Sequence, residues 1–310
     1  MKILTIDGGG IRGLIPAKFL QLVEDELGTA IHTYFDLVCG TSTGGIIALA
    51  IGAGIPMAEV VKMYCDAGPK IFRPGGRFRI SQFPLLFSKH SSAPLSQALR
   101  GVFKQRILGD SLVRLCIPSI NITDGQTTVF KTRHTRDHVY DEASPYKRDY
   151  LRSMYDVAMS TSAAPTYFPT HRIPGVGRHV DGGLWANNPS LIGISEAIRM
   201  GYGIEEIEVL SVGTGNTKFN ERRIGNLFSG IAGWRTRLID LTFLAQSQGY
   251  DFTAQYLLGP TQYFRVDPVL PTDFKLDQTK HIGRYLEYAE AAYRKTATDT
   301  QRRFFITPNR

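Results

Sequence analysis

The chain opens with two short apolar runs, and each run leads into a glycine-rich turn and a helical pattern. Residues 2–6 are apolar and rich in β-branched side chains, and the glycine turn at 8–13 leads to residues 16–27, where apolar positions recur at helical spacing. Residues 35–39 form a second run, followed by the turn at 40–45 and a helix of small residues. Strands that alternate with helices predict a largely parallel sheet covered on both faces.

The alternation continues toward the C-terminus with longer elements. Further strands are expected at 112–122, 127–132 and 206–212, and helices at 56–63, 151–162, 234–258 and 281–304. We therefore predict an α/β fold with three layers, α/β/α, around a mainly parallel central sheet. Residues 1–215 are expected to form the catalytic core, and residues 216–310 a mainly helical C-terminal extension packed on that core.

Length and composition agree with a globular chain. The protein has 310 residues, of which 43% are hydrophobic and 11% aromatic, so it can build a core and is not disordered. The length alone leaves open one large domain with insertions or two domains.

Cysteine usage and the N-terminus indicate a reducing compartment. Cys39, Cys65 and Cys116 have no C-x-x-C spacing, and no Cys/His cluster has the spacing of zinc ligands. The N-terminus lacks the pattern of a signal peptide, and the uncharged run 37–58 contains several glycines and Pro56, which favours a buried strand, turn and helix over a membrane span. We expect a cytoplasmic protein that uses no metal and no cofactor.

The net charge of +8 predicts attraction to an anionic partner. Residues 73–114 form a basic insertion in which Asp110 is the one acidic side chain. Its basic members are Arg73, Arg77, Arg79, Lys89, Arg100, Lys104, Arg106 and Arg114. The pattern leaves open a hydrated face or a surface that meets an anion.

The second glycine turn has the arrangement of a nucleophile elbow. Residues 40–44, G-T-S-T-G, match G-x-S-x-G between a strand and a helix. The flanking glycines let the backbone turn tightly, so that the hydroxyl of Ser42 is presented at the carboxyl end of the strand. This context predicts Ser42 as a nucleophile, with an ordinary loop serine as the alternative.

The first glycine turn has two interpretations. Residues 8–13 satisfy G-x-G-x-x-G, as in folds that bind dinucleotides, but the acidic residue that holds a ribose is missing at the end of the next strand. Residues 24–26 lie inside the helix, and Asp36 begins the next strand instead of ending it. The same glycines can present backbone N–H groups to an oxyanion formed when Ser42 attacks a carbonyl.

A serine nucleophile needs a base, and late histidines are scarce. His281 is the one histidine beyond the strongest acidic candidate, Asp181, and it lies in what looks like an ordinary helix start. The Asp-Gly-Gly sequence at 181–183 suits a carboxylate at a strand end whose backbone turns around a site, or an Asx-turn of no catalytic use.

In this order, the three turns resemble the patatin-like phospholipases. That family has a glycine-rich oxyanion loop, a G-x-S-x-G serine and a D-G-[GA] aspartate, which match residues 8–13, 40–44 and 181–183. Further blocks also resemble the family, at residues 162–169, 187–189 and 211–215. The resemblance covers about residues 1–215.

The resemblance implies a Ser-Asp dyad without histidine. Ser42 is then the nucleophile and Asp181 the base, and the product of attack is a covalent acyl-enzyme that water resolves. The implied oxyanion hole is the backbone of Gly8, Gly9, Gly10 and Gly13, with Arg12 helping to hold the loop. The implied activity is that of a lipid acyl hydrolase of phospholipase A or lysophospholipase type.

Within the family, the chain is similar to bacterial effectors of anti-phage defence that a cyclic oligonucleotide activates. The similarity implies membrane phospholipid as substrate, a cyclic di- or trinucleotide as activator, and peripheral contact with the inner membrane surface. We expect no DNA or RNA partner, and assembly into a homo-oligomer stays open. The alternative function is a non-hydrolytic protein that binds a nucleotide phosphate with the loop from Gly8 to Gly13.

Overall fold

The computed structural model describes residues 1–73, 88–133, 149–217, 236–271 and 274–306. Its strands are β1 (Lys2–Ile6), β2 (Leu37–Gly40), β3 (Arg114–Asn121), β4 (Gln126–Lys131), β5 (His171–Ile173), β6 (Gly177–Asp181), β7 (Glu208–Val212), β8 (Asn216–Thr217), β9 (Tyr263–Val266) and β10 (Val269–Leu270). Its α-helices are α1 (Leu14–Leu27), α2 (Thr43–Gly52), α3 (Met57–Ile71), α4 (Ala93–Phe103), α6 (Met154–Thr161), α7 (Gly183–Ala186), α8 (Ser190–Arg199), α10 (Thr236–Gln262) and α11 (Ile282–Phe304). Short 3₁₀ turns are η1 (Gly10–Gly13), η2 (Ile31–Thr33), η3 (Leu108–Asp110), η4 (Asp149–Leu151), η5 (Ile204–Glu206) and η7 (Thr279–His281).

Eight strands form one sheet in the order β5-β6-β3-β2-β1-β7-β9, with β4 paired to β3. The four central pairings, from β3 through β2, β1 and β7 to β9, are parallel, whereas β4, β5 and β6 join antiparallel. Parallel neighbours require crossover connections, and helices between the strands supply them. The predicted fold class is therefore confirmed.

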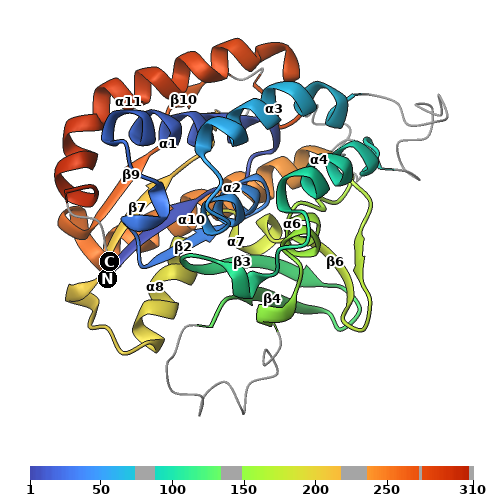
Figure 1. Cartoon of the computed structure of the whole chain (residues 1–310), viewed down its shortest axis with the longest axis horizontal. Coiled ribbons are helices and arrows are strands. Elements are labelled where there is room, and N and C mark those ends of the chain that lie inside the picture. Colours follow the sequence, from blue (N-terminus) through green and yellow to red (C-terminus); the bar gives the residue numbers. More distant parts are fainter. Residues whose placement is uncertain (74–87, 134–148, 218–235, 272–273, 307–310) are drawn as a thin grey trace, which may run out of the picture.

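Alternate residues of the central strands face two separate apolar clusters. Leu4, Val38 and Leu210 pack with α1, α2, α3 and α11, whereas their neighbours Ile3 and Val209 pack with α8 and α10. Side chains of a strand alternate between faces, so the sheet is buried on both sides. Figure 1 shows α1, α3 and α11 side by side on one face and α8 on the other, which makes three layers.

The route of β3 decides where β6 ends. Residues 114–116 of β3 pair with β2, and residues 119–121 pair with β6, while β4 takes residues 116–121. Because β4 occupies one edge of β3, β6 must share the other edge with β2. Strand β6 therefore runs toward the carboxyl end of β2 and stops there at Asp181.

Several predicted boundaries differ from the structure. The predicted helix at 56–63 continues to Ile71, and the predicted helix at 151–162 begins only at Met154. In its described part, the basic insertion contains α4, whose Leu95, Leu99 and Phe103 are buried. Arg77 and Arg79 of that insertion lie outside the described residues.

The central sheet does not end near residue 215, where the sequence pattern placed the end of the α/β core. Strand β9 pairs in parallel with β7, from Val209 opposite Tyr263 to Val212 opposite Val266. Helix α11 packs on α1, and the rings of Phe19 and Tyr293 meet edge to face. The segment expected as a helical extension thus supplies the edge strand of the sheet and part of its cover.

Candidate active site

Ser42 lies in a tight turn between β2 and α2. Its backbone has φ 55° and ψ −121°, a conformation that costs strain for a residue with a side chain. Side chains at Gly40 and Gly44 would collide with the backbone of Gly44 and of Ile6, respectively. The glycines of G-x-S-x-G are therefore required by close backbone approach, as the sequence predicted, and they leave the serine at the N-terminus of α2.

The hydroxyl of Ser42 meets the carboxylate of Asp181. Ser42 Oγ donates to Asp181 Oδ2 at 2.7 Å, and the N–H of Gly183 donates to Asp181 Oδ1 at 2.7 Å. Asp181 is fully buried, and this burial raises the pKa of its carboxyl to about 7, although both hydrogen bonds oppose the shift. The structure thus brings together two residues that lie 139 positions apart in the sequence.

Thr161 holds the backbone of the turn. Its Oγ1 accepts the N–H of Ser42 at 2.9 Å and donates to the carbonyl of Pro118 at 2.6 Å. This threonine ends α6 and is fully buried. Sequence reasoning missed it, because a single threonine at a helix end carries no motif.

The first glycine turn lies directly against Ser42. A Cβ added to Gly8 would stand 3.3 Å from the Cβ of Ser42. The N–H of Gly8 donates to Asn187 O at 3.0 Å, and its carbonyl accepts Thr214 Oγ1 at 2.7 Å, so this N–H is occupied. Within the part of the chain that the structure describes, the N–H groups of Gly9 and Gly10 have no hydrogen-bond partner.

The end of the same turn packs on other elements. Gly13 has no room for a side chain beside Thr43, and Gly10, at φ 59°, has none beside the carbonyl of Leu276. That carbonyl accepts the N–H of Ile11 at 2.8 Å. Gly9 and Gly10 therefore have N–H groups without a partner among the described residues, whereas the N–H of Gly8 is bonded.

Arg12, which is expected to help to hold the loop, lies within η1. Its Nε is buried and has no hydrogen-bond partner among the described residues. Burial lowers the pKa of Arg12, and the carboxylate of Asp240 is among the groups that oppose this shift. A second charged residue, Asp7, makes an ion pair at the start of the same loop.

Asp7, which precedes the glycines, is held by Arg265 of β9. The guanidinium donates to Asp7 at 2.7 Å from Nη2 and 3.3 Å from Nη1, and Nη2 also meets Asp267 at 3.0 Å. Burial raises the pKa of Asp7 to about 6, and the attraction of Arg265 limits that rise. Ser247 of α10 adds a hydrogen bond of 3.3 Å to Asp7. Arg265 is a functional residue that the sequence did not reveal, because it belongs to no motif.

The late histidine has a packing role. His281 stacks on Phe274 with 4.2 Å between ring centroids and an angle of 9°. It also meets the ring of Tyr285 edge to face, while the hydroxyl of Ser42 is bonded to Asp181. This geometry favours the carboxylate over His281 as the group that receives a proton from Ser42.

The assembled groups have the parts of an acyl-transfer site. A hydroxyl is bonded to a buried carboxylate, and backbone N–H groups of Gly9 and Gly10 lie in the loop packed against it. Acyl transfer requires a nucleophile with an adjacent base and donors aimed at the developing oxyanion. The first residues of α2 add the positive end of a helix dipole.

Comparison with known families decides the affiliation of the chain. The family model described as "Patatin-like phospholipase" matches residues 4–193, which include both glycine turns and Asp181. The chain belongs to this family. The patatin-like phospholipases are lipid ester hydrolases, so the nucleophile elbow and the carboxylate lie in a chain of that chemical class.

Two relatives that match in sequence agree with this affiliation. A protein of Pseudomonas aeruginosa named "cGAMP-activated phospholipase" is 34% identical over 89% of this chain and 80% of its own length. "Patatin-like protein 2" of Arabidopsis thaliana is 33% identical over 81% of this chain and 70% of its own. Among solved structures, VipD from Legionella pneumophila aligns with a TM-score of 0.42 and 12% identity over 92% of this chain and 66% of that one.

Removing the cation that holds Asp7 should destabilise this patatin-like chain. Arg265→Gln leaves a buried carboxylate beside Asp267 without its partner, and breaking a buried pair costs about 3–5 kcal/mol. The folded pKa of Asp7 is already raised, so ionising it opposes folding as pH rises through about 6, and loss of Arg265 pushes that pKa higher. The loss measured by urea unfolding should therefore be larger near pH 8 than near pH 5.

A matched control is Arg294→Gln, which removes an exposed cation 3.9 Å from Glu290. Exposed pairs of this kind contribute about 0–1 kcal/mol, so the control should unfold like the wild type. Equal losses for the two variants, or a loss for Arg265→Gln that does not grow with pH, would show that Asp7 does not depend on Arg265.

Proposed function

We propose that this patatin-like phospholipase hydrolyses fatty acyl esters of membrane glycerophospholipids through Ser42 and Asp181. The observation that carries the proposal is the hydrogen bond of 2.7 Å from Ser42 Oγ to the buried carboxylate. A reaction of this kind needs no group beyond the side chains and backbone already described.

In the first half-reaction, Ser42 Oγ attacks the ester carbonyl carbon while Asp181 accepts the hydroxyl proton. The carbonyl oxygen becomes an oxyanion, which the N–H groups of Gly9 and Gly10 stabilise. Collapse of this intermediate breaks the ester C–O bond, and Asp181 returns its proton to the leaving alcohol. The products are an acyl-enzyme on Ser42 and a phospholipid that has lost one acyl chain.

In the second half-reaction, water takes the place of the alcohol. Asp181 removes a proton from water as its oxygen attacks the acyl carbonyl, and a second oxyanion forms at the same N–H groups. Collapse releases the fatty acid and returns the proton to Ser42 Oγ. The enzyme regains its starting state, and in the net reaction one ester and one water have become one fatty acid and one alcohol.

The environment of Asp181 makes its carboxylate a stronger base than an ordinary aspartate. An ordinary aspartate has a pKa near 4, far below that of a serine hydroxyl, and proton transfer improves as the two values approach. Burial raises the pKa of Asp181 to about 7, so the residue is a stronger base and still ionises near neutral pH. The hydrogen bond from Gly183 keeps one oxygen fixed, which leaves Oδ2 to receive the proton.

The substrate places the enzyme at a membrane surface. Across the described residues, no helix is long and apolar enough to cross a bilayer. We infer peripheral contact with the anionic inner surface of the membrane, supported by the net charge of +8. Each basic residue near such a surface contributes about 1 kcal/mol.

We also infer that a cyclic nucleotide activates the enzyme. The support is the name of the Pseudomonas aeruginosa relative, "cGAMP-activated phospholipase", which matches 89% of this chain.

Family membership favours ester hydrolysis over the alternative function, a non-hydrolytic protein that binds phosphate with the first glycine turn. In that turn, the N–H of Gly8 is already bonded, which leaves fewer donors for a phosphate.

Replacing either member of the dyad should remove ester hydrolysis. Ser42→Ala lacks the nucleophile, and Asp181→Asn lacks the base, a loss of roughly 10²–10⁴-fold in rate. A fluorophosphonate should label Ser42 of the wild type, as mapped by mass spectrometry. The control Asp66→Asn removes an exposed carboxylate on α3 and should keep full activity.

Folding must be checked in the same variants. The folded pKa of Asp181 is raised, so its ionisation opposes folding as pH rises from about 4 to about 7. Asp181→Asn has no such charge and should unfold no more easily than the wild type above that window. A folded Ser42→Ala or Asp181→Asn protein that retains wild-type hydrolysis would exclude the dyad.

The pH dependence of hydrolysis should report the base. Only the ionised carboxylate accepts a proton, so kcat/KM should rise with pH and level off above the pKa of Asp181, about 7. The measurement is kcat/KM for a soluble short-chain ester across a pH series. A rate that is already constant at about pH 5 would contradict a base with a raised pKa.

Activation should appear as nucleotide-dependent hydrolysis. Release of fatty acid from phospholipid vesicles by the wild type is measured with a panel of cyclic di- and trinucleotides, cGAMP among them, and without any nucleotide. At least one member of the panel should raise the rate. Equal rates across the panel would indicate a constitutive enzyme.

A further inference from the structure

A cavity of about 340 Å³ lies at the end of α2 opposite Ser42. It lies within the size range of small-molecule sites, roughly 300–1,000 Å³. Its wall comes from the turn between α2 and α3, the first turn of α3 and the end of α4. The residues that matter below are Ile55, Pro56, Glu59, Val102, Lys104 and Arg106.

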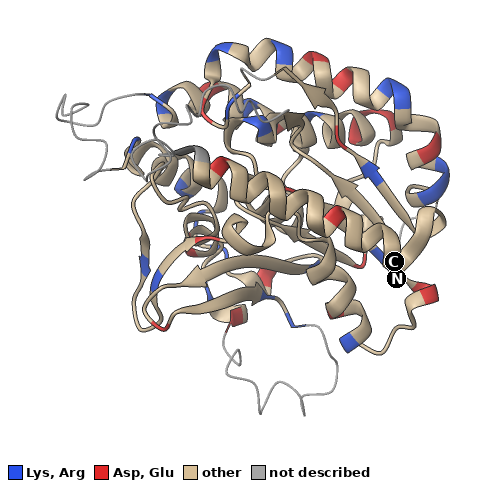
Figure 2. Ribbon diagram, turned by 180° about the vertical axis from the view of Figure 1, so that it is seen from behind, with Lys and Arg blue, Asp and Glu red and all other residues tan. Residues whose placement is uncertain are grey.

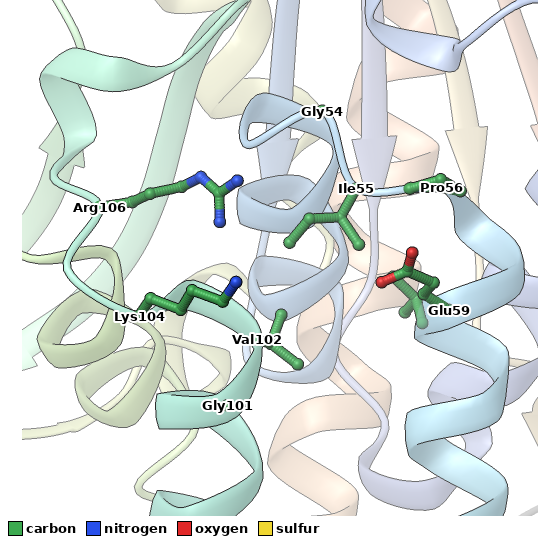
Figure 3. A pocket seen from close by; sticks show the side chains of 9 residues that line it. Gly54, Ile55, Pro56, Glu59, Gly101, Val102, Lys104 and Arg106 are labelled. Atoms are coloured by element: carbon green, nitrogen blue, oxygen red, sulfur yellow. The ribbon is translucent and has the colours of Figure 1, made fainter.

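Two cations of the cavity have no charged partner among the residues that the structure describes. Lys104 and Arg106 make no ion pair or side-chain hydrogen bond with the described residues. Figure 3 shows both side chains extending into the cavity from the segment after α4, with Glu59 on the opposite wall. The apolar side chains of Ile55 and Val102 lie between them.

The backbone at Lys104 is strained. Its φ of 52° and ψ of −119° nearly repeat the values at Ser42, and a residue with a side chain adopts this conformation only at a cost of about 1–3 kcal/mol. The conformation turns the chain sharply out of α4 and brings Lys104 and Arg106 to the same cavity. A glycine would adopt this backbone conformation without strain. The chain nevertheless has a lysine at this position, so the strained backbone carries a cation.

Elsewhere the charges are mixed. Along α11, acidic and basic residues alternate, as Figure 2 shows. The cavity differs because its two cations lie together and are not neutralised by a paired carboxylate. Lys104 and Arg106 belong to the basic segment predicted from the sequence, and in its described part they line this cavity.

We propose that this cavity binds a cyclic nucleotide through its phosphodiester group. The inference rests on the proposed activation and locates it. An Arg fork and a Lys ammonium are the usual partners of a phosphate oxygen. The apolar wall of Ile55, Pro56 and Val102 suits the face of a base, and Glu59 can accept N–H groups from its edge. A bare phosphate would gain nothing from the apolar wall and would be repelled by the carboxylate.

Helix α3 connects the cavity to the catalytic groups. Its first turn carries Glu59, and in the next turn Tyr64 donates to the carbonyl of Thr43 at 3.2 Å and also meets the Thr43 hydroxyl. Near its end, a side chain on Gly68 would stand 2.6 Å from Ile11 of the oxyanion loop. A ligand that moves the start of α3 therefore acts on the residue after Ser42 and on the loop that holds the oxyanion.

The test measures binding separately from catalysis. Binding of cGAMP to the purified full chain is measured by calorimetry, with inorganic phosphate at the same concentration as a second probe. The variant is Lys104→Gly with Arg106→Gln, because glycine adopts the backbone at 104 freely and keeps the fold. The control Lys62→Gln removes one exposed cation of α3 outside the cavity.

The wild type and Lys62→Gln should bind cGAMP equally and bind inorganic phosphate far more weakly. Each lost cation should weaken cGAMP binding by about tenfold or more, so the double variant should lose about a hundredfold. A wild type that binds no cGAMP, a double variant that binds it as well as the wild type, or equal binding of phosphate and cGAMP would overturn the site.

Glu59→Gln tests whether Glu59 contacts the base of the ligand or its phosphodiester group. Loss of the carboxylate removes repulsion of phosphate and removes the strong acceptor for a base, so phosphate should bind more tightly and cGAMP less tightly. If both ligands change in the same direction, Glu59 does not face the base.

Vesicle hydrolysis by the same proteins distinguishes the two proposals. If the double variant loses cGAMP binding and also cGAMP-dependent hydrolysis, the proposed activation and the proposed site are both supported. If the wild type binds cGAMP at these residues but hydrolyses lipid equally with and without it, the site stands and activation fails. If hydrolysis responds to cGAMP in the wild type and equally in the double variant, activation stands and this site is wrong.

Discussion

The site depends on one arrangement, a buried carboxylate hydrogen-bonded to the hydroxyl of a buried serine. Burial alone would keep Asp181 protonated, and its hydrogen bonds with Ser42 and Gly183 restore part of the stability of the charged form. The balance leaves the pKa near neutrality, where the group can both accept and return a proton. Strands β2 and β6 pair with the same edge of β3 and run toward each other. Their carboxyl ends therefore lie close together, which lets Asp181 contact Ser42.

The chain also accepts costs near this contact. Ser42 has a strained backbone, the turn beside it admits no side chains, and Asp7 is buried close to other carboxylates. Arg265 offsets the burial of Asp7, and Thr161 accepts the N–H of Ser42, which would otherwise be unsatisfied. Such local costs are common where a site must be held in a fixed geometry before its ligand arrives.

The sequence predicted the parts of the site that local geometry dictates. Side chains at the glycines around Ser42 and after Asp181 would collide with neighbouring atoms, so close packing requires these glycines, and the motif and the structure agree. The sequence did not indicate Arg265 or Thr161, because their roles come from packing between distant segments and each is a single ordinary residue. For the same reason the core seemed to end near residue 215, since the four-residue strand β9 is too short to stand out between long helices.

The pairing of Asp7 with Arg265 also has a consequence for the order in which the enzyme becomes competent. The two residues lie 258 positions apart, so a ribosome has to release most of the chain before the guanidinium can reach the carboxylate. Until then the first glycine turn lacks its anchor, even though Ser42 was made long before. A growing chain therefore contains both members of the proposed dyad before the loop beside them is anchored.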